Sequence, residues 1–276
     1  MAYKYLPADL PKRLRAAGLT VVEVDGWRTR GRPASTGAHA PVGVLCHHTA
    51  TGRSVSDTAV VALLKNGRSD LAGPLAHFGL SRNGTVYMIA AGRANHAGKA
   101  KASGSVSGGD GNALYVGIEA FNDGVGEPWP SAQYEAYVTL CAVLCLHVTG
   151  NSAKTVRGHR ETSVTGKIDP TFDMAKFRDR VAARMGELRA PADTRPAVSL
   201  ERVKRAAQTP AWRRALTGKR VLADRRRVRA ALKAEGCATF AEWQRRLGYT
   251  GADADGIPGR ASLTALGDRQ GFRVVP

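Results

Sequence analysis

The segment Val42-Gly43-Val44-Leu45-Cys46-His47-His48-Thr49-Ala50 combines a short apolar run with a polar end. This pattern predicts a buried strand over residues 42–48 that delivers side chains to a site at its end. Neighbouring residues of a strand point to opposite faces, so only one of His47 and His48 can easily join a given site.

Strand and helix signals alternate on both sides of this segment. Asn83-Gly84 separates two apolar runs and predicts a hairpin with a two-residue turn. Ser54, with Asp57 three residues later, predicts the start of a helix. The alternation predicts an α/β fold, with a mixed central sheet flanked by helices. The further predicted elements are strands over 76–81, 85–89 and 114–121 and amphipathic helices over 131–148 and 172–188.

A second polar cluster lies far along the chain. His159 opens the run Gly158-His159-Arg160-Glu161, and Asp169 follows across a loop that contains Gly166. With His47 these residues make a set of two imidazoles and a carboxylate, which suits zinc and leaves the fourth tetrahedral position free, as catalytic sites require. Lys167 could stand beside that free position. The set predicts a zinc hydrolase, provided the fold brings the three ligands together.

Composition divides the chain into unequal parts. The segment 188–199 is rich in proline and lacks apolar periodicity, which predicts a linker. We therefore expect a catalytic domain over 1–189, a linker over 190–199 and a smaller, mainly helical, basic domain over 200–276.

The net charge of +18 is unevenly spread. Residues 197–276 hold 17 Lys and Arg against 7 Asp and Glu, and the preceding residues hold 24 against 16. A surface of this charge seeks a polyanion: nucleic acid, anionic lipid or an acidic cell-wall polymer.

The sequence carries no signal of a membrane or disulfide protein. Residues 1–7 lack the apolar core of a signal peptide, and no run of about 18 apolar residues suggests a membrane span. The four cysteines form neither a disulfide framework nor a zinc knuckle. We expect a monomer made in a cytoplasm, without a membrane partner.

Five elements, in chain order between about Gly43 and Val181, resemble those of the zinc-dependent N-acetylmuramoyl-L-alanine amidases, whose fold is shared with peptidoglycan recognition proteins. Residues 27–33 and the basic tail look like those of phage endolysins that attack actinobacterial walls. From about Val228 the tail weakly resembles short helical peptidoglycan-binding modules. The five elements are His47-His48-Thr49-Ala50, Ala76-His77-Phe78 leading into Arg82-Asn83-Gly84-Thr85-Val86, Asn95-His96-Ala97-Gly98, Val116-Gly117-Ile118-Glu119, and His159 with Lys167-Ile168-Asp169-Pro170.

The resemblance implies a zinc site. Carried over residue by residue, it makes His47, His159 and Asp169 the ligands of Zn²⁺. His48 then lies outside the ligand set and packs or hydrogen-bonds nearby.

The resemblance also implies the catalytic and substrate-binding groups. Lys167 matches the position that stabilises the oxyanion, and Glu119 matches the general base. Some phage members carry a tyrosine where this chain has Ala76, which shifts the acid/base work to Glu119. His96 and Asn95 are expected to contact the substrate.

The implied function is that of a phage endolysin that hydrolyses the amide between N-acetylmuramic acid and L-alanine in peptidoglycan. Such a protein would be made in the host cytoplasm and reach the wall after a holin opens the membrane. Its partners would be peptidoglycan and anionic wall polymers.

Three other classes stay open. A non-catalytic peptidoglycan receptor on the same fold typically loses a metal ligand, whereas this chain has all three. A cytoplasmic muropeptide-recycling amidase would have little use for a basic tail. A nucleic-acid-binding protein is suggested by charge alone, and an aromatic content of 6% without a recognised binding motif argues against it.

Overall fold

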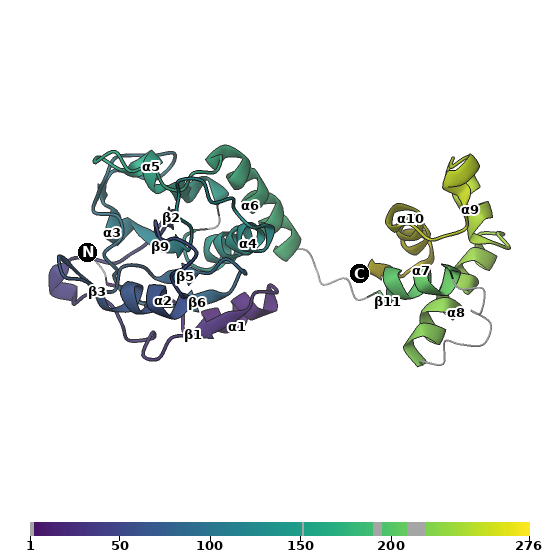
Figure 1. The fold of residues 1–276 in the computed structure, drawn as a ribbon, viewed down its shortest axis with the longest axis horizontal. Coiled ribbons are helices and arrows are strands. Elements are labelled where there is room, and N and C mark those ends of the chain that lie inside the picture. The colour runs from purple at the N-terminus through teal and green to yellow at the C-terminus, as the bar shows by residue number, and fades with distance from the viewer. Residues whose placement is uncertain (1–2, 151, 190–194, 209–218) are drawn as a thin grey trace. The chain divides into compact units, whose positions relative to one another are not determined.

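A computed structural model describes residues 3–150, 152–189, 195–208 and 219–276. The chain divides into two compact units, Met1–Ala190 and Pro191–Pro276 (Figure 1). Among the described residues, none of the helices has the length and apolar character needed to cross a membrane.

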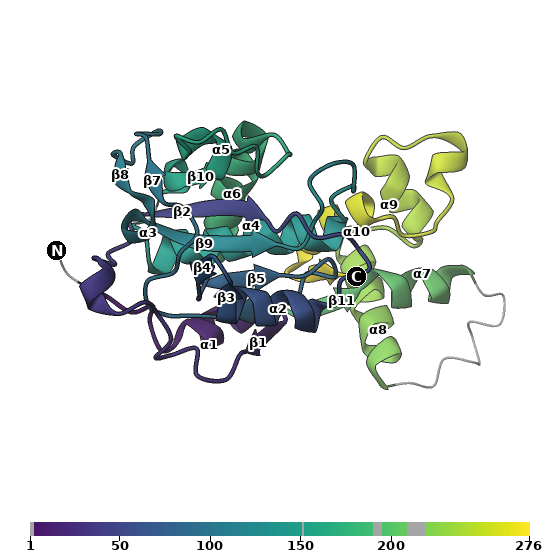
Figure 2. The ribbon, with the colours of Figure 1, turned by 60° about the vertical axis from the view of Figure 1, so that its left-hand side comes forward.

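A six-stranded mixed sheet forms the centre of the first unit. Its strand order is β1-β6-β5-β9-β2-β10. The strands β5, β9, β2 and β10 are parallel neighbours, whereas β5 and β6 form the antiparallel hairpin predicted around Asn83-Gly84. The predicted two-residue turn is wrong, because the Ser81 N–H donates to the Thr85 carbonyl and three residues, 82–84, connect the pair. Figure 2 shows β2, β9 and β5 side by side. The strand bounds are β1 (Val21–Glu23), β2 (Gly43–His48), β5 (Phe78–Leu80), β6 (Val86–Met88), β9 (Tyr115–Ala120) and β10 (Val156–Gly158).

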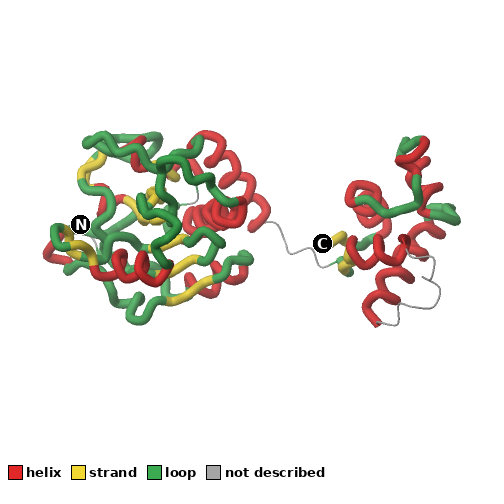
Figure 3. Tube along the Cα trace, in the orientation of Figure 1, coloured by secondary structure: helices red, strands yellow, loops and turns green. Residues whose placement is uncertain are grey.

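Helices cover the sheet, as the fold class predicted from the alternating pattern requires (Figure 3). The helices α1 (Leu10–Ala16), α4 (Ser131–His147) and α6 (Met174–Arg189) share one core with side chains such as Val44 and Cys46 of β2. Alternation along β2 turns Leu45 and His47 to the opposite face. There α2 (Asp57–Asn66) packs Leu64 into a separate small core.

The start of α2 corrects one sequence prediction. The N-cap is Ser56, whose hydroxyl accepts a hydrogen bond from the Ala59 N–H at 3.3 Å, and the helix begins at Asp57. Ser54, the predicted start, is therefore two residues too early. Both serines precede the apolar run, and spacing alone cannot choose between them.

Short elements complete the first unit. They are β3 (Gly67–Arg68), β4 (Leu71–Ala72), β7 (Lys99–Ala100), β8 (Gly109–Asp110), α3 (Gly111–Leu114), α5 (His159–Thr162) and the single turns Ala34–Thr36 and Ala153–Thr155.

The second unit is mainly helical in its described part. Trp243 is fully buried in its core and donates its indole N–H to the Ser262 carbonyl at 2.8 Å, so this tryptophan is a core residue. The unit contains β11 (Ala197–Ser199), α7 (Leu200–Gln208), α8 (Lys219–Ala234), α9 (Phe240–Arg246), the short turn Gly251–Ala254, α10 (Arg260–Gln270) and β12 (Arg273–Val275).

The predicted linker over 190–199 extends too far toward the C-terminus, because residues 197–199 form a strand. Its residues 190–194 lie outside the described residues, but β11 pairs in parallel with β12, and Val198 is fully buried in the second core. The partner strand is more than seventy residues away, so local composition could not reveal this pairing.

Candidate active site

The pairing of β2 with β9 brings two candidate residues together. His47 and Glu119 are partners in the parallel register, and both therefore lie on the sheet face opposite α4. The Tyr137 hydroxyl of α4 accepts a hydrogen bond from the His47 backbone N–H at 2.9 Å and faces the carbonyls of His47 and Ile118 at 3.1 Å each. One buried hydroxyl thus ties both strands together at the level of the site.

Strand β10 positions His159. β10 pairs with β2 so that Gly158 lies beside Cys46, and the next residue, His159, opens α5 next to His47. The Glu161 carboxylate accepts the Gly158 N–H at 2.8 Å and is bridged by Arg157 and Arg178. These bonds hold the turn that presents the second imidazole.

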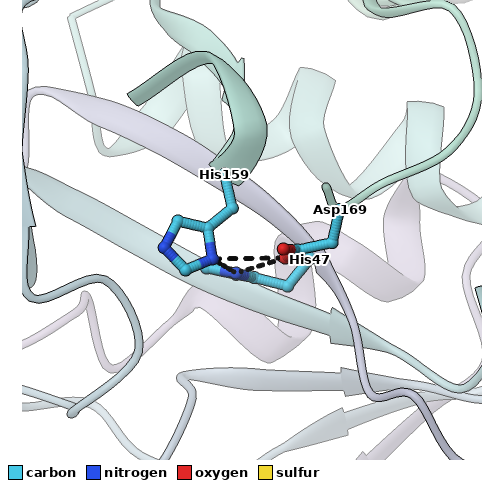
Figure 4. Close-up of side chains that lie close together, drawn as sticks. All are labelled: His47, His159 and Asp169. Atoms are coloured by element: carbon cyan, nitrogen blue, oxygen red, sulfur yellow. Dashed lines mark hydrogen bonds and ion pairs between the residues drawn. The ribbon is translucent and has the colours of Figure 1, made fainter. Parts of the chain in front are cut away.

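His47, His159 and Asp169 converge on one point (Figure 4). His47 Nδ1 lies 3.1 Å from His159 Nδ1 and 3.0 Å from Asp169 Oδ2, and His159 Nδ1 lies 3.3 Å from the same oxygen. A tetrahedral zinc ion with bonds of about 2.0–2.2 Å spaces its ligand atoms about 3.3 Å apart. The triangle therefore fits the ion, and the residues are close enough to act as one ligand set.

The electrostatics of the three side chains suit a cation. Burial lowers the pKa of His47 to about 4, although the hydrogen bond with Asp169 opposes this shift. Burial alone would raise the pKa of Asp169, but the hydrogen bonds with His159 and His47 lower it overall. Neutral imidazole and ionised carboxylate are the forms that bind a metal.

Glu119 and Lys167 border the same groove. The groove has a volume of about 800 Å³ and is lined by both residues together with the three converging side chains. Burial raises the pKa of Glu119 well above its usual value; the charge of Asp169 adds to this, and Lys167 opposes it. Glu119 Oε2 is buried and has no hydrogen-bond partner among the described residues. Lys167 is exposed, and its backbone N–H donates to Ser163 Oγ at 3.3 Å.

Asn95 and His96 also line the groove, and both are tied to the protein. Asn95 Nδ2 donates to the Ala72 carbonyl at 2.9 Å. His96 Nδ1 lies 3.1 Å from His47 Nε2, and its Nε2 lies 3.2 Å from the Tyr115 carbonyl. Substrate contact by these two residues stays a prediction.

The side chain of His48 leaves β2 on the face opposite to that of His47. The centroid of its ring lies 6.4 Å from that of Trp129, and His48 is not one of the three converging side chains, although it lines the same groove. Position on a strand was enough to separate the two adjacent histidines.

Sequence reasoning missed two features that support the site. Tyr137 was visible only as part of the apolar stripe of a helix, because a hydroxyl aimed at strand backbone leaves no local signal. His39 and His77 form a stacked pair, with their Nε2 atoms 3.0 Å apart, beneath His96. His39 comes from an irregular segment, so its place beside the sheet follows from the tertiary fold alone.

A model of a known protein family matches part of the first unit. Residues 37–172 match the family model described as N-acetylmuramoyl-L-alanine amidase (Amidase_2). The matched segment contains His47, Glu119, His159, Lys167 and Asp169. No curated protein matches the sequence.

Several solved structures resemble the chain. The endolysin N-acetylmuramoyl-L-alanine amidase LysCS from Clostridium intestinale has 17% identity and a TM-score of 0.44, over 59% of this chain and 95% of that one. The Staphylococcus aureus hydrolase AmiA has 15% identity and a TM-score of 0.42, over 67% and 94%. The Drosophila peptidoglycan recognition protein SA has 20% identity and a TM-score of 0.36, over 51% and 80%.

Proposed function

We propose that the first unit is a zinc-dependent amidase that hydrolyses the bond between the lactyl group of N-acetylmuramic acid and the L-alanine of the stem peptide. The convergence of His47, His159 and Asp169 at 3.0–3.3 Å, beside Glu119 in one groove, carries this proposal. The match of residues 37–172 to the amidase family supports the same reaction.

The residues divide the chemistry between them. Zinc held by the three side chains supplies Lewis acidity toward water and the amide carbonyl. Glu119 takes a proton from the attacking water at Oε1 or Oε2 and delivers it to the leaving amine. Its raised pKa suits this exchange, because a carboxyl group that is too acidic returns a proton poorly.

Lys167 completes the site from the groove rim. Its ammonium group stabilises the oxygen that becomes negative when the amide carbon turns tetrahedral, a role worth about 3–4 kcal/mol for a single donor. Ala76 is fully buried and has no acid/base group, so Glu119 carries both proton transfers.

We assign wall attachment to the second unit and an endolysin role to the whole chain. The excess of basic residues over 197–276 supports attraction to anionic wall polymers. The complete ligand set with Glu119 speaks against a non-catalytic receptor, and the basic second unit speaks against a recycling enzyme.

Metal removal and product analysis test the proposal. Purified protein is expected to release stem peptides from cell walls, to lose this activity with a chelator and to regain it with zinc. Mass spectrometry of the digest identifies the bond through its new termini. Asp169→Asn is the matched control, since it keeps the shape and removes the charged ligand. Intact muropeptides after long digestion with zinc-loaded protein would falsify the enzymatic assignment.

A further inference from the structure

The outer nitrogen of His47 makes a contact that the proposed reaction leaves unexplained. His47 Nδ1 faces His159 and Asp169, so Nε2 points away from them. It lies 3.1 Å from Nδ1 of His96, and the two rings meet edge to face at 83° with centroids 5.2 Å apart. His47 is therefore held at both nitrogens.

The partner of His96 Nε2 determines which ring nitrogen carries the proton in each of the two imidazoles. His96 Nε2 lies 3.2 Å from the Tyr115 carbonyl oxygen, which can only accept a hydrogen bond. His96 must then carry its proton on Nε2, which leaves Nδ1 as an acceptor. This acceptor requires His47 to carry its proton on Nε2. The lone pair of His47 Nδ1 is then available to a cation held with His159 and Asp169, which would take the place of the hydrogen bond between Nδ1 and Asp169.

The fold holds His96 in place on two sides. The buried Asn112 side chain accepts hydrogen bonds at Oδ1 from the backbone N–H groups of His96 and Ala97, at 2.8 Å each. On β9, a Cβ at Gly117 would lie 2.5 Å from Cγ and Nδ1 of His96. The glycine therefore makes room for the imidazole ring on the face of the sheet.

We propose that His96 is a positioning residue that fixes the tautomer and ring orientation of His47, so that Nδ1 is presented to zinc. This inference rests on the proposed function for the identity of the metal. It differs from the substrate contact predicted for His96, because both ring nitrogens are already engaged by protein atoms.

The test measures zinc affinity by competition with a chromophoric chelator, alongside kcat and KM on a soluble muramyl peptide. His96→Ala is expected to weaken zinc binding about 10–100-fold, the usual cost of losing a partner that orients a metal ligand. His96→Asn keeps an acceptor near the position of Nδ1 and is expected to recover most of this affinity. His147→Ala is the matched control, since His147 is exposed at the end of α4, where it contacts Arg13, and its loss should change nothing.

Each alternative leaves a different result. If His96→Ala binds zinc as tightly as the unaltered protein and only KM rises, His96 is a substrate contact and the proposal is wrong. If the alanine and asparagine variants lose affinity equally, the ring is needed for packing alone, which also overturns it. Should the unaltered protein bind zinc but leave muropeptides intact, the hydrolase assignment falls, while a selective loss of affinity in His96→Ala still supports the positioning role.

Discussion

At the scale of single residues, the site contains a carboxyl group whose charged form is unfavourable. Glu119 is half-buried, its buried Oε2 has no partner among the described residues, and Asp169 adds a like charge nearby. A structure built only for stability would place an amide or an apolar side chain there. The cost of keeping this acid is consistent with a role as a proton carrier.

Replacement of Glu119 by glutamine should therefore separate activity from stability. We expect hydrolysis to fall about 10²–10⁴-fold, because the amide cannot carry the proton. In the metal-free protein we expect the melting temperature to be higher than that of the unaltered protein at pH 7–8. The pKa of Glu119 is raised on folding, so its contribution to stability is retained below the unfolded value of 4.5 and lost as the pH rises through the raised pKa.

Thermal unfolding of both proteins across pH 4–8, with a chelator present, checks this expectation. The difference in melting temperature should shrink toward pH 4, where Glu119 is protonated in the folded and unfolded chains alike. A difference that does not change with pH would contradict the assigned burial effect.

The sequence predicted that His47, His159 and Asp169 come together, but not which residues support them. His47, His159 and Asp169 could be proposed because ligand chemistry restricts the candidate residue types and the resemblance supplied their positions. The contact of His96 with His47 could not be foreseen, because it depends on where Asn112 pins the loop of residues 96–98. A loop histidine between small residues gives no hint of that direction.

At the scale of elements, parallel pairing assembles the site. Strand β9 carries Glu119, β2 carries His47, and His159 comes directly after β10. These three strands are neighbours in the sheet. The carboxyl ends of parallel strands meet at one edge, so side chains far apart in sequence come together there. The strands and main helices were predictable from periodicity, whereas the strand order needs long-range pairings that no local window contains.

The start of α2 offers a direct test of element boundaries. Ser56→Ala removes the N-cap hydroxyl, and we expect a loss of about 1 kcal/mol in the free energy of unfolding. In a unit of this size the melting temperature should fall by about 2–4 °C. Ser54→Ala is the control, because Ser54 is exposed and its side chain makes no hydrogen bond within the described part of the chain. An equal fall in both variants would contradict the assignment of Ser56 as the N-cap.

At the scale of the whole molecule, each of the two units has its own hydrophobic core. The first unit contains the groove and the converging side chains of His47, His159 and Asp169, and the second has its own core around Trp243. The division into a sheet-containing part and a smaller helical part was expected from composition. Its boundary was harder to place, because β11 is recognised only through its pairing with β12.

Truncation after residue 190 should separate cleavage from wall attachment. We expect the fragment to hydrolyse soluble muramyl peptides at a rate within about twofold of the full chain, because the site residues all lie in the first unit. Sedimentation with whole walls should show weaker binding by the fragment. Binding by the full chain should fall as salt rises from about 0.05 to 0.5 M, since exposed charges are screened. Equal, salt-insensitive binding by both proteins would remove the targeting role of the second unit.

A metal ion bound by His47, His159 and Asp169, as proposed, would also cross-link the chain. His47 and Asp169 are separated by 122 positions, so one cation bound where they meet would join β2 to the loop before α6. At free metal about 100 times the dissociation constant, this binding would increase the free energy of unfolding by about 2.7 kcal/mol. A preparation stripped of metal would then unfold sooner and be digested faster by proteases near residues 160–169. Catalytic competence and survival in a lysate would decline together.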